Sequence, residues 1–67
     1  MTGEVKSYNP RKGYGFITAD GVDYFAHFKQ WKERVPFTKG LRVEFTPKET
    51  QKGIAATEIR IGGEHGE

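Results

Sequence analysis

The 67-residue chain contains no cysteine, so neither a disulfide bond nor a cysteine-based zinc site can stabilise it. No apolar run approaches the roughly 18 residues of a membrane-spanning helix. The N-terminus also lacks the apolar segment of a signal peptide. We therefore expect a cytoplasmic protein with no membrane partner. A chain of this length buries only about 60% of its unfolded surface, which predicts a single domain with a thin core.

Neither sign of charge dominates the sequence. Eleven basic residues face nine acidic ones, for a formal net charge of +2. Two of the acids, Glu64 and Glu67, lie in the Gly-rich segment 62–67, which we expect to be a flexible tail after a domain spanning 1–61. Without them, eleven basic residues stand against seven acidic ones. This modest basic excess is compatible with a nucleic-acid partner but does not require one.

Aromatic residues, by contrast, are plentiful. Five Phe, three Tyr and one Trp make nine large rings in a chain with little interior. Rings that cannot all fit inside a small core must lie partly on the surface, where a cluster of them usually marks a binding site.

Turn signals divide the sequence into short runs rich in β-branched and aromatic residues. Asp20-Gly21 is typical of a tight hairpin, and a turn is expected over 47–53. Only 28–34 could form a helical turn, before Pro36. Five such runs with almost no helix predict an all-β fold, a five-stranded antiparallel barrel whose closure removes exposed strand edges. The five expected strands span 4–8, 14–19, 23–27, 41–46 and 54–61.

Alternation within the second run separates two faces. Tyr14, Phe16 and Thr18 share one face, because residues two apart in a strand point to the same side. Ile17 and Ala19 share the opposite face and suit a core better. The sequence therefore predicts that the Tyr14 and Phe16 rings face outward.

The third run alternates in the same way. Phe25 and His27 share a face with Asp23, while Tyr24 and Ala26 lie on the other. A charged residue beside Phe25 again indicates solvent, so the rings of both runs are expected on one outward surface of the hairpin.

This predicted patch has two interpretations. For any single Phe in a strand, burial in the core is the better expectation. Four rings on one polar face favour a surface on which bases stack while cations neutralise phosphates. The rings are Tyr14, Phe16, Phe25 and His27, and the cations that flank them in sequence are Lys6, Arg11 and Lys12.

Four segments carry a resemblance to the bacterial cold shock proteins. They are VKSYN at 5–9, KGYGFI at 12–17, DYFAHF at 23–28 and KGIAATEI at 52–59. The likeness covers about residues 3–61, and two of the segments resemble the family's two ribonucleoprotein motifs. An RNA-recognition-motif domain has a similar KGYGFI stretch, but it needs two helices and an aromatic residue where Ala19 stands.

The resemblance implies an OB-fold barrel that binds single-stranded RNA and DNA with low sequence preference and melts weak RNA structure. It implies no cofactor. The positions that match the family's binding motifs are Lys6, Tyr8, Lys12, Tyr14, Phe16, Phe25, His27, Phe28 and Lys52.

The chain also departs from the family pattern. Ser7 stands where the first strand usually has Trp, so one stacking ring is missing. Phe37 aligns with a core leucine and Trp31 with a core isoleucine, which leaves no exposed loop aromatic. We expect Trp31 to be partly buried. The alternative is that Trp31 fills the place left by Ser7.

The sequence favours a nucleic-acid-binding module resembling an RNA chaperone, and two alternatives remain open. One is a protein-interaction module that uses the aromatic patch, and the other is a transcriptional regulator that binds a DNA element. We predict no enzyme, no catalytic residue and no small-molecule substrate. His27 has only His65 as a second histidine, in the expected tail, so no metal site is predicted.

Overall fold

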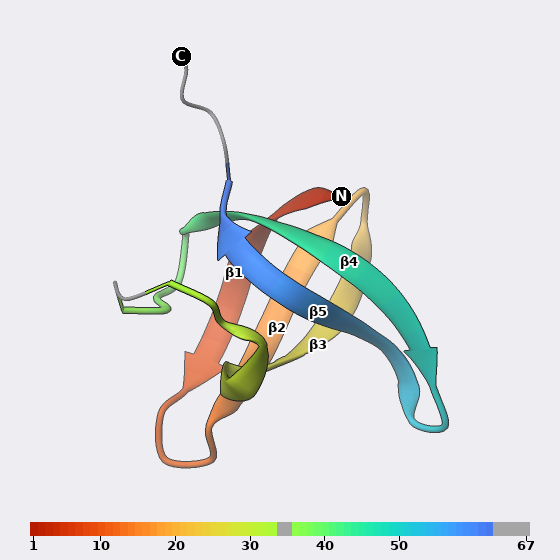
Figure 1. The fold of residues 1–67 in the computed structure, drawn as a ribbon, viewed down its shortest axis with the longest axis horizontal. Coiled ribbons are helices and arrows are strands. Elements are labelled where there is room, and N and C mark those ends of the chain that lie inside the picture. The colour runs from red at the N-terminus through yellow and green to blue at the C-terminus, as the bar shows by residue number, and fades with distance from the viewer. Residues whose placement is uncertain (34–35, 63–67) are drawn as a thin grey trace.

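A computed structural model describes residues 1–33 and 36–62, and within these ranges five strands close into a barrel (Figure 1). One 3-10 turn, η1 (Phe28–Gln30), follows the third strand. The predicted all-β barrel with at most one short helical turn is therefore confirmed. The strands are β1 (Thr2–Asn9), β2 (Tyr14–Ala19), β3 (Val22–His27), β4 (Arg42–Thr50) and β5 (Gly53–Ile61).

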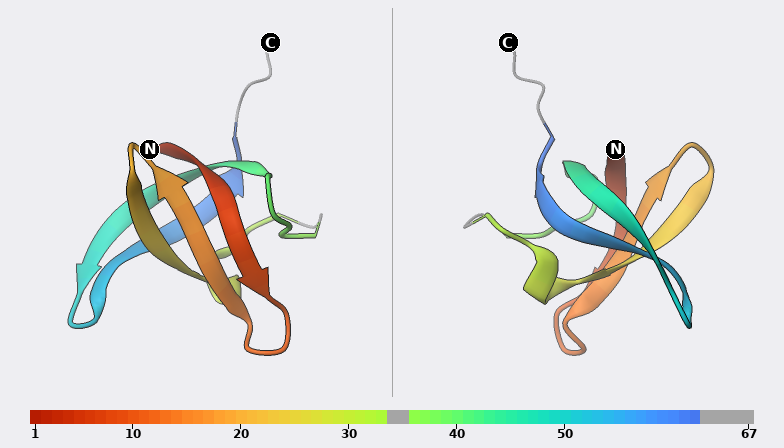
Figure 2. Two further views of the ribbon diagram at one scale, coloured as in Figure 1. Left: turned by 180° about the vertical axis from the view of Figure 1, so that it is seen from behind. Right: turned by 45° about the vertical axis from the view of Figure 1, so that its right-hand side comes forward.

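The strands follow one another around the barrel in the order β1-β2-β3-β5-β4. β1, β2 and β3 form a meander that β4 and β5 cross (Figure 2). The pairings are antiparallel except that between β3 and β5, where Phe25 and Ala26 run parallel to Ala55 and Ala56. This parallel junction, which alternation along the chain did not predict, places the start of β5 beside the end of β3.

The hairpin predicted at Asp20-Gly21 is confirmed. Ala19 pairs directly with Val22, so only these two residues form the turn between β2 and β3. Asp20 and Gly21 have φ angles of 53° and 78°, as a type I′ turn requires at both central positions. Residues 14–27 therefore form a tight hairpin.

The turn predicted over 47–53 is present but limited to two residues. β4 continues to Thr50, and only Gln51 and Lys52 separate it from β5. Pro47 lies inside β4 and pairs with Ala56. Along that stretch β4 is paired to β5 and not to β1, and an edge strand tolerates a residue without an N–H donor. The resulting β4–β5 hairpin extends beyond the rest of the barrel (Figure 1).

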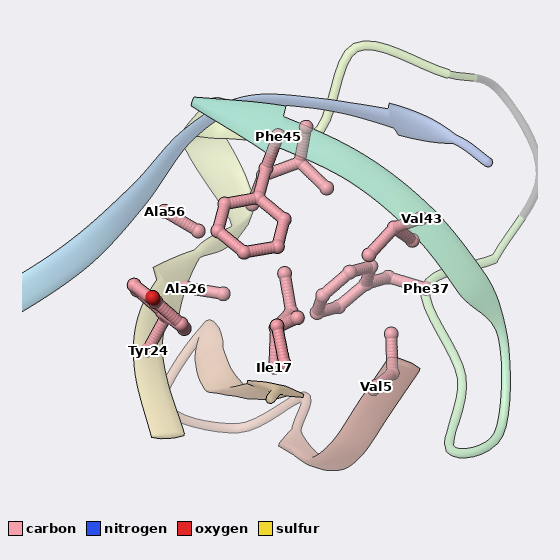
Figure 3. Close-up of a cluster of buried hydrophobic side chains, with 10 residues drawn as sticks. Val5, Ile17, Tyr24, Ala26, Phe37, Val43, Phe45 and Ala56 are labelled. Atoms are coloured by element: carbon pink, nitrogen blue, oxygen red, sulfur yellow. The ribbon is translucent and has the colours of Figure 1, made fainter. Parts of the chain in front are cut away.

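The core lies between the meander and the two crossing strands (Figure 3). Ile17, Ala19, Tyr24 and Ala26, the residues predicted to face inward, are all buried. No polar or charged side chain of the described residues is buried with them. The buried hydrophobic set is Val5, Ile17, Ala19, Tyr24, Ala26, Phe37, Val43, Phe45, Ala56 and Ile59.

The segment after η1 is extended and lies along β5. Trp31 forms a parallel bridge with Ile59, and the Lys32 N–H donates to the Ile59 carbonyl at 2.9 Å. The helical turn expected over 28–34 is thus limited to η1, and Arg34 is outside the described residues. Because Trp31 and Lys32 are attached to β5 in this way, the C-terminal end of η1, which contains Phe28, is held against the barrel.

At the C-terminal end, Gly62 is buried and its N–H donates to the Arg42 carbonyl at 2.8 Å. The rest of the tail expected over 62–67 lies outside the described residues. No helix among the residues that the structure describes is long and apolar enough to cross a membrane.

Candidate nucleic-acid interface

Five aromatic side chains form a continuous surface, here called the aromatic band. The register between β2 and β3 sets Tyr14 opposite His27 and Phe16 opposite Phe25, and residues directly opposite each other point to the same face. Phe28, the first residue of η1, comes directly after His27 and continues this surface. Phe16 and Phe25 are each 37% exposed and Phe28 is 49% exposed. The prediction that Tyr14, Phe16, Phe25 and His27 share the outward face of the hairpin is confirmed.

The rings of the band support one another. The Phe25 ring centroid lies 5.1 Å from that of Tyr14 and 6.0 Å from that of Phe16. His27 and Phe28 are stacked, with centroids 5.2 Å apart and planes at 28°. These separations fall in the range of favourable aromatic pairs. The band is therefore a preorganised surface with Phe25 at the centre of the β2–β3 portion.

A glycine makes it possible for both β2 rings to face outward beside β1. Gly15 is buried, and a Cβ added there would lie 2.7 Å from the Tyr8 Cα. The β1 backbone passes this point too closely for any side chain. The glycine between the two aromatic residues thus allows β1 to pack against β2.

Four rings of the aromatic band form one wall of a groove of about 770 Å³, namely Tyr14, Phe16, Phe25 and His27. The β4–β5 hairpin provides the opposite wall, because the parallel junction sets Ala55 beside Phe25 and the antiparallel one sets Lys48 beside Ala55. The groove residues outside the band are Asp23, Gln30, Lys48, Thr50, Lys52, Gly53, Ile54, Ala55, Ala56 and Thr57.

The predicted cations occupy different positions relative to the groove. Lys52 lines it, whereas Arg11 and Lys12 lie in the exposed β1–β2 loop. Lys6 donates from Nζ to the Asp23 Oδ2 at 2.7 Å. The hydrogen bond and charge of Lys6 lower the pKa of the Asp23 carboxyl. Lys6 is therefore held at the rim by an ion pair.

Tyr8 is not brought into the aromatic band. A bulge at Lys6 shifts the β1–β2 register, so that Ser7 pairs with Phe16 and Tyr8 pairs with the buried Gly15. The half-buried Tyr8 ring packs edge-on against Phe37, with centroids 5.1 Å apart. Ser7 is exposed on the outward face instead.

The two loop aromatics pack as the sequence predicted. Phe37 is buried, and Trp31 is half-buried with its ring centroid 5.1 Å from that of Phe37. Trp31 does not line the pocket of about 410 Å³ beside Ser7. The structure therefore gives no support to the alternative that Trp31 replaces the missing first-strand ring. The described residues that line this pocket are Lys6, Ser7, Tyr8, Pro10, Phe37, Thr38 and Lys39.

Sequence reasoning missed much of the second groove wall. Lys48 was assigned to a turn, and nothing predicted that Gln30 or Ile54 would face the band. The residues after Pro47 are polar and uniformly exposed, so no alternation marked Lys48 as a strand residue. The position of Ile54 depends on the parallel junction and had no local signal.

No group of three or more His, Cys, Asp or Glu side chains in residues 1–33 and 36–62 could hold a metal ion. His27 instead accepts a hydrogen bond at Nδ1 from the Lys29 N–H, at 3.1 Å. His65 is outside the described residues.

Comparisons with known proteins agree with this geometry. The family model described as 'Cold-shock' DNA-binding domain matches residues 1–61. The cold shock-like protein CspA of Vibrio cholerae is 41% identical over 63 residues, which cover 88% of this chain and 90% of that protein. CspA of Bordetella pertussis is 44% identical, covering 90% of this chain and 96% of its own. For the cold shock protein CapB of Pseudomonas syringae the identity is 41%, over 91% and 93% of the two chains. The chain therefore belongs to the cold-shock domain family, whose members bind nucleic acids and are not enzymes.

Proposed function

We propose that this protein binds single-stranded RNA and DNA along the aromatic band and acts in the cytoplasm as an RNA chaperone of low sequence specificity. The observation that carries the proposal is the set of exposed, mutually supported rings beside a groove that contains Lys48 and Lys52. Bases stack on such rings whatever their identity, and the ammonium groups neutralise phosphates.

The proposed mechanism needs no chemical step. Bases can reach the rings of Phe16, Phe25 and Phe28 only when they are unpaired, because paired bases cannot splay out. Binding to the open strand but not to the duplex shifts a weak RNA hairpin toward its open form by mass action.

A hairpin-opening assay tests this mechanism directly. An RNA hairpin with a weak stem carries a fluorophore and a quencher at its ends, and protein is titrated at constant salt. We expect fluorescence to rise to saturation, with a midpoint that moves to higher protein concentration as the stem is strengthened. If the protein binds single strands but does not open the hairpin, the proposed chaperone activity is contradicted and the proposed single-strand binding still stands. Tight binding to the paired stem would instead favour a regulator of duplex DNA or RNA.

Salt dependence should be shallow, because few cations border the binding surface. Lys12, Lys48 and Lys52 are exposed, and Lys6 is paired with Asp23. With about 0.7 counterions released per phosphate of a single strand, log K against log salt should fall with a slope of about −2 to −3. Fluorescence anisotropy of a labelled single strand, titrated at several salt concentrations, measures the slope.

Matched variants test whether the lysines of the groove cause the salt dependence. Lys48→Ala and Lys52→Ala are each expected to reduce its magnitude by about 0.7. Lys32→Ala removes an exposed cation that does not line the groove and should leave the slope unchanged. Binding without any salt dependence would contradict phosphate neutralisation and favour an apolar protein partner.

Restoring a ring at position 7 should strengthen binding. Ser7 is exposed and pairs with Phe16, so a Trp there would lie beside the aromatic band. We expect Ser7→Trp to increase single-strand affinity by about 1–3 kcal/mol, the value of one base-aromatic stack. Anisotropy titrations of both proteins with the same oligonucleotide measure the gain.

The control for this variant is Ser7→Leu, which adds apolar area at the same position without a π-face. It should gain much less than Ser7→Trp. An equal gain for both would mean that the new side chain only covers the Phe16 ring.

A further inference from the structure

Gln30, at the end of η1, lines the groove and also contacts the backbone of β5. Its Oε1 accepts a hydrogen bond from the Glu58 N–H at 3.1 Å, across 28 positions of the sequence. A backbone N–H can be met only by the oxygen of the amide, so this contact fixes which end of the Gln30 side chain faces β5. The same side chain is half-buried and lines the groove.

The backbone of β5 explains why Glu58 needs this partner. The β4–β5 register shifts between Glu44 and Thr46, which pair with Arg60 and Thr57, so Glu58 belongs to a bulge. Its φ angle of 51° is unusual for a residue other than glycine. The N–H of Glu58 therefore turns out of the ladder and donates to Gln30.

The contact holds the Oε1 end of the Gln30 side chain at Glu58. The amide nitrogen is the other end, and its two hydrogens are available to a ligand in the groove that Gln30 lines. His27 accepts from the Lys29 N–H at Nδ1, so its neutral imidazole carries the hydrogen on Nε2 and donates from there. Among the described groove residues, the Asp23 carboxylate and the Thr50 and Thr57 hydroxyls are further side-chain acceptors, and the two hydroxyls donate to the Gly53 and Thr46 carbonyls.

Nucleobases differ in what they offer to such a donor. Uracil and guanine carry a keto oxygen, at O4 and O6, where cytosine and adenine carry an amino group. This position lies on the edge away from the sugar. A base bound with its sugar and phosphate toward Lys48 and Lys52 would therefore present that edge to Gln30. An amide N–H₂ facing an amino group would leave two donors without acceptors.

We propose that Gln30 determines base specificity, by donating from its amide nitrogen to a keto group and so favouring uracil and guanine over cytosine and adenine in the subsite that it borders. The inference rests on the proposed function, since it concerns which base the single-strand groove accepts. It adds a modest preference to a surface whose stacking contacts do not distinguish bases.

The test compares oligo(U) with oligo(C) of equal length, which differ in hydrogen bonding at the keto or amino group of C4 and at N3. For the wild-type protein we expect oligo(U) to bind about three- to tenfold more tightly, the effect of one hydrogen bond. Gln30→Glu keeps an oxygen for the Glu58 N–H and presents the other to the groove, so the ratio should reverse in favour of oligo(C). Gln30→Met presents no polar group, and its ratio should approach one.

The variants are compared by the ratio of their affinities for oligo(U) and oligo(C). Absolute affinities are not used, because the negative charge of Gln30→Glu weakens binding of both strands. Gln51→Glu is the matched control: it makes the same charge change in the β4–β5 turn, outside the described groove lining, and should keep the wild-type ratio. Circular dichroism establishes that each variant is folded.

The possible results separate the inference from the proposed function. Equal binding of both strands by the wild type would overturn the role of Gln30 and leave single-strand binding intact. An unchanged ratio in Gln30→Met would also overturn it, because the selection would come from another residue. Failure of the wild type to bind either strand would overturn the proposed function and the inference with it.

Discussion

Gly15→Ala is expected to abolish the stable fold. The added Cβ would collide with the Ser7 carbonyl oxygen and lie 2.7 Å from the Tyr8 Cα. Both are backbone atoms, so β1 itself would have to move away from β2. Overpacking of this kind costs about 3 kcal/mol or more at its upper end, while a domain of this length has a total stability of about 3–10 kcal/mol. Urea unfolding followed by Trp31 fluorescence measures the loss.

Gly21→Ala is the matched control for this substitution. Nothing lies within 4 Å of a Cβ at Gly21, but its φ of 78° disfavours a side chain, at a cost of about 1–2 kcal/mol. Gly15→Ala therefore tests the effect of a steric collision, whereas Gly21→Ala tests the effect of an unfavourable backbone conformation alone. Equal stability of the two variants would mean that β1 moves aside easily and that its close approach is unimportant.

Local alternation was sufficient to predict the faces of β2 and β3. Thr18 and Asp23 mark the solvent side of the two strands, and Ile17 and Ala26 mark the core side. Because the hairpin turn between them has only two residues, the register followed from the turn. The outward face of Tyr14, Phe16, Phe25 and His27 could thus be derived from residues 14–27 with no knowledge of the rest of the barrel.

Tyr8 shows what a motif match does not reveal. A single extra residue at Lys6 reverses the face of everything that follows it in β1, since side chains alternate with a period of two. Tyr8 therefore packs on Phe37 and Ser7 faces outward. Nothing in the sequence around Lys6, such as a glycine, marks the bulge, and motif matching assigned Tyr8 to the binding surface.

The groove depends on contacts between residues that are distant in sequence. Lys48 and Ile54 face the aromatic band because β5 pairs in parallel with β3, a junction of Phe25 and Ala26 with Ala55 and Ala56. A local pattern predicts that a strand exists but not which neighbour it pairs with. The orientation of Gln30 is harder still to predict from the sequence, because it depends on the bulged backbone of Glu58.

Phe25→Ala is expected to cause the largest loss of single-strand binding among single replacements in the aromatic band. Phe25 is the ring that contacts both Tyr14 and Phe16, and it is 37% exposed beside the groove. Its removal deletes one stacking surface and leaves two neighbouring rings without support. We expect affinity to fall by about 1–3 kcal/mol, measured by anisotropy with a labelled single strand. The free energy of unfolding should change less, because the ring lies outside the buried core.

Two comparisons show whether this loss comes from stacking. Val22→Ala, which shortens an exposed apolar side chain on the same strand outside the described groove lining, should leave affinity unchanged. The plot of log K against log salt should shift downward for Phe25→Ala with its slope intact, because no cation has been removed. A changed slope would mean that the bound strand had moved away from the lysines. Unfolding without a separable binding defect would return Phe25 to the core, and the aromatic band would then be a packing surface.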